Sequence, residues 1–113
     1  MKIEKDIVYL YGFSTRKQVY LENLVNIVRG QIKNNVRIAI VFLHDGVIGT
    51  SQNGAIPSLV EELLAFPVSV FALVPDLLAR GISPNTVDPR IQCIEYDDLV
   101  DVLVQIPRTA SWM

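Results

Sequence analysis

The sequence has only one cysteine and one histidine in 113 residues, and no cluster of basic residues. A lone Cys93 excludes an internal disulfide and is compatible with a reducing cytoplasm. One cysteine and one histidine are also too few ligands for a structural zinc site. Ten basic against twelve acidic residues give a net charge of −2. Without a stripe of lysine or arginine to neutralise phosphates, direct binding to nucleic acid is not expected.

No hydrophobic run is long enough to span a bilayer, and the charges of both signs at positions 2–6 argue against a signal peptide. Hydrophobic residues nevertheless make up 50% of the chain, and the mean hydropathy is +0.34. This is apolar for a small domain, which has much surface to cover. We therefore expect one domain, 1–113, with part of its apolar surface lying against partner subunits.

Strand-like and helix-like segments alternate along the chain. Strands are expected at 6–13, 38–43, 68–74 and 91–96, from their β-branched and apolar runs. Helices are expected after the capping-box pair Thr15 and Gln18, with Pro57 in a first turn, over 75–81, and from Asp97 or Asp98 through Val104. This alternation predicts an α/β three-layer sandwich around a mostly parallel sheet of four to five strands. We prefer a flavodoxin-like order, with strand 2 beside strand 1, followed by strands 3 and 4.

The stretch 44–50, HDGVIGT, directly follows the most apolar expected strand. His44 and Asp45 suggest a general base with a carboxylate, or two metal ligands. Adjacent residues leaving a strand point to opposite sides, however, and no serine or cysteine stands beside them. The other interpretation is a turn, in which Asp45 binds backbone N–H groups and Gly46 takes a positive φ. Turn chemistry alone explains Asp-Gly and favours this second interpretation.

No cofactor is expected from the glycines. Gly46, Gly49 and Gly54 do not make a Walker or dinucleotide fingerprint. Flavin binding would rest on fold analogy alone. The acidic residues near the last helix are explained as caps of its N-terminus rather than as a cation site, so no metal is expected. These acidic residues are Glu95, Asp97, Asp98 and Asp101.

Cys93 is the only available thiol nucleophile or sulfur carrier. Reactive thiolates lie at helix N-termini or near cations. Cys93 instead stands in the middle of an expected strand, which favours a packed thiol. A stand-alone sulfurtransferase that carries a persulfide on Cys93 remains the alternative function.

Three residues are our candidates for contacts between subunits. Tyr20 and Ile27 widen the apolar stripe of the first expected helix beyond what one sheet can cover. Trp112 lies in an apolar C-terminal tail that would fray unless it docks on this domain or on a neighbour. We expect a homodimer or higher homo-oligomer when the chain is alone, since closed symmetry is the usual solution.

Three segments, in order, resemble the DsrH/TusB family. Residues 42–47, FLHDGV, are similar to a strand and turn that usually reads LLQDGV in that family. Residues 70–81, VFALVPDLLARG, are similar to its VYAL and DLxARG pieces, and place the short-helix motif at Asp76, Arg80 and Gly81. Residues 94–100, IEYDDLV, with Trp112 resemble its IDYxxFV and closing tryptophan. The match runs from about residue 38 to the C-terminus.

The resemblance implies a DsrE/DsrF-like fold and a cytoplasmic subunit that is not an enzyme by itself. It makes the turn of His44, Asp45 and Gly46 a family signature, although His44 replaces the usual glutamine. Family members assemble with DsrE/TusD-like and DsrF/TusC-like sisters. These complexes relay persulfide sulfur, either for 2-thiolation of wobble uridine in tRNA or for dissimilatory sulfur oxidation. In the carrier sister the sulfur-bearing cysteine lies where strand 3 meets the short helix, a turn that here reads Leu73-Val74-Pro75 and has no thiol.

Overall fold

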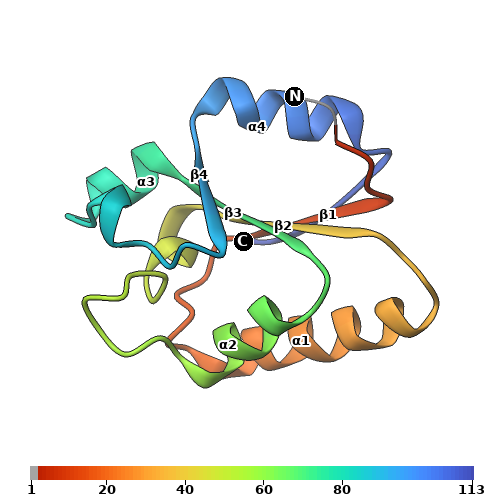
Figure 1. Ribbon diagram of the computed structural model, residues 1–113, viewed down its shortest axis with the longest axis horizontal. Coiled ribbons are helices and arrows are strands. Elements are labelled where there is room, and N and C mark those ends of the chain that lie inside the picture. The colour runs from red at the N-terminus through yellow and green to blue at the C-terminus, as the bar shows by residue number, and fades with distance from the viewer. Residues whose placement is uncertain (1–2) are drawn as a thin grey trace.

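Five parallel strands form the middle layer of the computed structural model, which describes residues 3–113 (Figure 1). Their order in the sheet is β4-β3-β2-β1-β5. The strands are β1 Ile7–Tyr11, β2 Ile38–Phe42, β3 Ser69–Leu73, β4 Ile91–Ile94 and β5 Arg108–Trp112. The helices are α1 Gln18–Lys33, α2 Ser58–Ala65, α3 Val74–Ala79 and α4 Tyr96–Gln105, with 3-10 turns η1 His44–Val47 and η2 Pro84–Thr86. The α/β class and the parallel sheet are as predicted.

Helices cover both faces of the sheet, which makes the molecule a three-layer sandwich. α1 and α2 lie together on one face and α4 lies on the other (Figure 1). The central strand β2 is buried throughout, because its side chains alternate between the two layers. Ile40 and Phe42 join the core under α1 and α2, whereas Ala39 and Val41 join the core under α4.

The strand order differs from the flavodoxin-like order that we expected. β3 pairs with β2, at Val41 and Phe71 for example, and not with β1. The helices explain the difference. α1 and α2 cover the same face, so two right-handed crossovers carry β1, β2 and β3 in one direction across the sheet. Only α4 crosses on the other face, and it returns the chain to the free edge of β1.

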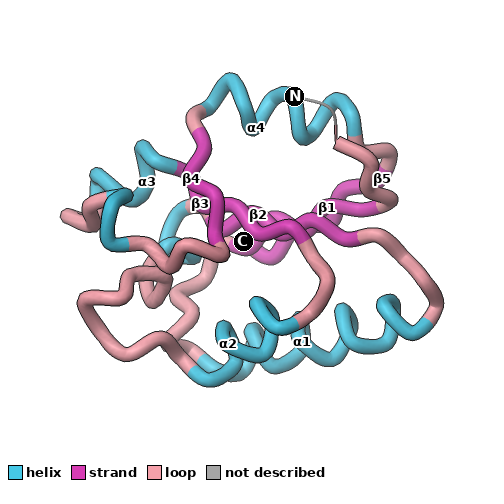
Figure 2. The backbone as a smooth tube through the Cα atoms, viewed as in Figure 1, coloured by secondary structure: helices cyan, strands magenta, loops and turns pink. Residues whose placement is uncertain are grey.

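The expected C-terminal tail is a strand rather than a loose end. β5 lies beside β1 (Figure 2) and pairs with it in parallel, in a register that places Trp112 opposite Tyr11. The Trp112 ring packs against Tyr9, with 5.4 Å between ring centroids. The tail therefore docks on its own sheet, where it covers an edge that β1 would otherwise expose.

Several helix starts differ from the sequence prediction. The Thr15 hydroxyl is buried and donates to the Ile48 carbonyl, so Thr15 does not cap α1, whose N-cap is Lys17. Pro57 is the N-cap of α2 and lies just before its first turn. α4 begins at Tyr96, and Glu95 and Asp98 form its capping box; Asp98 is thus the third helical residue and not the cap. A left-handed residue, Asn35 with φ of 60°, follows the end of α1.

No helix within residues 3–113 is both long enough and apolar enough to cross a membrane.

Candidate functional site

Two of the three segments that carry the resemblance, 42–47 and 70–81, meet at the carboxyl edge of the sheet. η1 follows β2, and α3 follows β3, the next strand in the sheet. The backbone N–H of His44 donates to the Asp76 carboxylate at 2.7 Å. This bond holds the first residue of η1 against the first turn of α3. His44 contributes its backbone to this bond, so the bond does not depend on the identity of the side chain at this position.

Arg80 makes the second connection between these motifs. Its Nε donates to Asp45 Oδ1 at 3.0 Å, and its Nη1 donates to the Asp76 carbonyl at 3.2 Å. Nη1 also lies 4.0 Å from Asp76 Oδ1. We call the set of His44, Asp45, Asp76 and Arg80 the motif clamp. Its charges are paired with one another, so its arrangement fixes a loop to a helix.

The turn at 44–46 forms, but its backbone differs from our expectation. His44 has the positive φ, 51°, and Gly46 does not. Asp45 binds the Arg80 side chain. Glycine is required at 46 for a different reason: a Cβ there would lie 2.1 Å from the Tyr11 carbonyl oxygen. Gly81 ends α3 with φ of 70°, as the motif predicted.

Cys93 lies on the edge strand β4 and is partly buried against the core under α1 and α2. Its Sγ lies 3.8 Å from the Pro84 carbonyl oxygen. Burial raises the pKa of the Cys93 thiol, because the charged thiolate is poorly solvated there. A thiol in this environment is a weaker nucleophile at neutral pH than a free cysteine.

The other site candidates lie outside the motif clamp. No group of three or more His, Cys, Asp or Glu within residues 3–113 is placed to hold a metal ion. Tyr20 is 43% exposed and stacks on Phe13 with 4.2 Å between centroids, and Ile27 is 40% exposed. Trp112 is partly buried on β5.

A second exposed apolar surface, on α4, was missed by the sequence analysis. Its residues recur at helical spacing, and the sheet-facing side of α4 buries Val102. The periodicity was visible in the sequence, but the sequence analysis considered only the capping residues of this helix. The exposed members are Tyr96, Val100, Leu103 and Val104.

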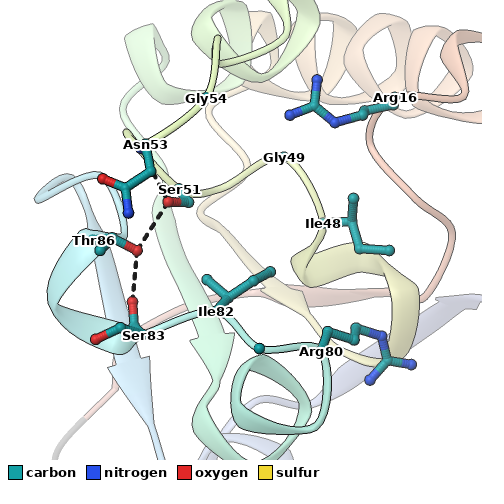
Figure 3. A pocket seen from close by; sticks show the side chains of 11 residues that line it. Arg16, Ile48, Gly49, Ser51, Asn53, Gly54, Arg80, Ile82, Ser83 and Thr86 are labelled. Atoms are coloured by element: carbon teal, nitrogen blue, oxygen red, sulfur yellow. Dashed lines mark hydrogen bonds between the residues drawn. The ribbon is translucent and has the colours of Figure 1, made fainter.

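A pocket of about 510 Å³ lies beside the motif clamp (Figure 3). One wall is the loop that follows η1, with Gly49, Ser51 and Gly54. The opposite wall is the segment from Arg80 to Thr86. Arg16, from the turn before α1, closes the third side. No sequence motif indicated this pocket, because its residues come from three distant segments.

The fold and its carboxyl edge place the chain among small α/β proteins with an all-parallel five-stranded sheet. The structure is similar to that of the ychN protein from E. coli, with a TM-score of 0.79 and 15% identity, over 96% of this chain and 100% of that one. It is also similar to MTH1491, a protein of unknown function from Methanobacterium thermoautotrophicum, with a TM-score of 0.75 and 18% identity over the same shares. At such identities these likenesses show the fold alone.

Sequence comparisons identify the family. The model of the DsrH like protein family matches residues 17–108. Protein TusB from Pectobacterium carotovorum is 31% identical over 93 residues, which are 82% of this chain and 90% of that one. Protein TusB from Pectobacterium parmentieri is 34% identical over 74 residues, 66% of this chain and 74% of that one. The chain belongs to the DsrH-like family, and the resemblance read from its motifs is confirmed.

Proposed function

We propose that this chain is a non-catalytic subunit of a cytoplasmic sulfur-relay complex. Membership of the DsrH-like family supports a sulfur-relay subunit. The observation that supports a non-catalytic role is the use of the motif residues. Asp45, Asp76 and Arg80 bind one another and the His44 backbone, which leaves a structural clamp where an active site would be expected.

The cysteine content supports the same proposal. The turn from β3 into α3 has Leu73, Val74 and Pro75, so the position that carries sulfur in the carrier sister has no thiol here. Cys93 is partly buried and has a raised pKa. These features disfavour the alternative, a stand-alone sulfurtransferase that uses Cys93.

The proposed partners are DsrE/TusD-like and DsrF/TusC-like sister subunits. Apolar side chains exposed on both helical layers support an assembled state, since such surface is costly in water at about 25 cal/mol per Å². They include Tyr20 and Ile27 on α1, and Val100 and Val104 on α4.

Co-expression tests the proposal. The chain, tagged, is expressed with the DsrE-like and DsrF-like proteins encoded in its own genome and analysed by native mass spectrometry. We expect a complex that contains all three chains. An unrelated small α/β protein with the same tag serves as the control. Recovery of this chain without either sister would contradict the proposal.

Deletion of the gene separates the two end uses. Loss of 2-thiouridine from wobble positions, measured by mass spectrometry of digested tRNA, would assign the relay to tRNA thiolation. Unchanged tRNA with a defect in oxidation of stored sulfur would assign it to sulfur oxidation.

A further inference from the structure

We infer that the pocket beside the motif clamp binds a small ligand through a tetrahedral oxyanion, such as a phosphate or thiosulfate group. The pocket is lined by the segments that follow β2 and β3, beside the carboxyl edge of the parallel sheet, where open α/β sheets bind their ligands. Its volume of about 510 Å³ falls in the range of roughly 300–1,000 Å³ typical of small-molecule sites.

The walls of the pocket are held in place by bonds between distant segments. Ser51 Oγ donates to Thr86 Oγ1 at 2.9 Å, and the Gln52 N–H donates to the Thr86 carbonyl at 2.7 Å. The buried Thr15 hydroxyl holds the start of the loop through the Ile48 carbonyl. The loop and the segment after α3 therefore form a preorganised cleft, which reduces the entropy lost on binding.

The lining of the pocket carries positive charge, and one of its two cations is uncompensated. None of the eleven lining residues is acidic. Within residues 3–113 the Arg16 guanidinium has no hydrogen bond or ion pair, and it reaches over the loop toward Gly54 (Figure 3). Arg80 also lines the pocket, but Asp45 pairs its charge. Arg16 is thus the cation available to a ligand, and a planar guanidinium suits two oxygens of one oxyanion.

Neutral donors complete the site. The Ser83 hydroxyl and the Asn53 amide line the pocket and have no hydrogen-bond partner within the described residues. They come from opposite walls (Figure 3). The N-terminus of α1, which follows Arg16, has no acidic residue in its first turn and no side-chain cap. Its positive end adds to the potential that attracts an anion.

NMR titration of the full chain tests this inference. Inorganic phosphate, thiosulfate and adenosine monophosphate are added separately, with sodium chloride at matched ionic strength as the reference. We expect saturable shifts of the Gly49, Gly54 and Ser83 amides for at least one oxyanion. The comparison of the free ions with the nucleotide tells whether the ligand is an isolated oxyanion or a larger phosphorylated molecule.

Two variants locate the site. Arg16→Gln should weaken binding about tenfold, the loss of one charge-assisted hydrogen bond. Lys33→Gln removes the same charge at the other end of α1 and should change affinity less than about twofold. An equal loss of affinity in both variants would overturn the inference. So would amide chemical shifts that sodium chloride alone reproduces. Because the sister subunits are absent, the result is independent of the proposed relay function.

Discussion

At the scale of single residues, the motif clamp connects two sequence motifs that lie more than 30 positions apart. Asp76 accepts from the His44 backbone, and Arg80 reaches Asp45 and its own helix. The identities of Asp45 and Arg80 were predictable as a family motif, and their mutual contact was not. Nothing in either segment alone states that β2 and β3 are neighbours; that depends on the sheet order.

Gly46→Ala should lower the free energy of unfolding by about 1–3 kcal/mol, because the new Cβ would meet the Tyr11 carbonyl oxygen and the turn must shift. Gly30→Ala is the matched control: nothing lies within 4 Å of an added Cβ, and Gly30 lies in the last turn of α1. This control should gain about 0.5–1 kcal/mol from helix propensity. Urea unfolding followed by circular dichroism measures both. If Gly46→Ala were as stable as the wild type, the turn would have space for a Cβ at this position.

Tyr11 gives a pH-dependent prediction. Its hydroxyl is buried without a hydrogen-bond partner in residues 3–113, and burial raises its pKa to about 12. The folded state therefore keeps the proton that the unfolded state releases above pH 10, so stability falls as pH rises from 10 to 12. Tyr11→Phe should remove this part of the decrease in stability, and should raise the free energy of unfolding at pH 7 by about 1 kcal/mol.

Guanidinium unfolding at pH 7 and pH 11 checks the Tyr11 prediction. Tyr96→Phe, which removes an exposed hydroxyl, should unfold like wild type at pH 7. If Tyr11→Phe were instead the less stable protein at pH 7, the hydroxyl would have a hydrogen-bond partner in solution.

At the scale of elements, the periodic segments were predictable and the ends were not. β2 was predictable from the apolar run 38–43, because a central strand is buried on both faces. α1 was predictable from the apolar stripe that it packs on the sheet, formed by Leu21, Leu24, Val25 and Val28. Thr15 looked like a helix cap, yet its hydroxyl binds a loop 33 residues away. β5 was missed since only the end of the tail, at Trp112, is strongly apolar and residues 108–111 are mostly polar. Pairing with β1 holds this segment in an extended conformation.

Trp112→Ala should test how much β5 contributes. The ring covers Tyr9 and is only partly buried, so we expect a loss of about 2 kcal/mol, less than for a fully buried tryptophan. Ser111→Ala, an exposed position on the same strand, should change stability by less than about 0.5 kcal/mol. Unfolding is measured at two protein concentrations. A loss that appears only at the higher concentration would place Trp112 at a contact between subunits, as we considered from the sequence.

At the scale of the whole molecule, the high apolar content is divided among two cores and two exposed helical surfaces. The cores lie on either side of the sheet. On α1 the exposed surface includes Tyr20 and Ile27, and on α4 it includes Val100 and Val104. Composition alone predicted that apolar surface would remain exposed; only the fold tells which side of each helix carries it.

The isolated chain is expected to be a dimer at micromolar concentration, measured by light scattering. Tyr20→Ala with Ile27→Ala should shift it toward monomer, because these side chains form the apolar part of the α1 surface. Val100→Ala with Val104→Ala is the matched pair on α4. A monomeric wild type would refute the dimer. Loss of the dimer only in the α4 pair would move the contact to the other helical layer.

The central claim is that this chain supports sulfur transfer without carrying sulfur itself. Its most direct test is to assemble the complex with wild-type chain or with Cys93→Ser, load it from a persulfide donor, and record the intact mass of every subunit. We expect one added sulfur on a sister subunit, none on this chain, and equal loading with the Cys93 variant. An added sulfur on this chain that disappears in Cys93→Ser, together with a loss of transfer, would contradict the claim.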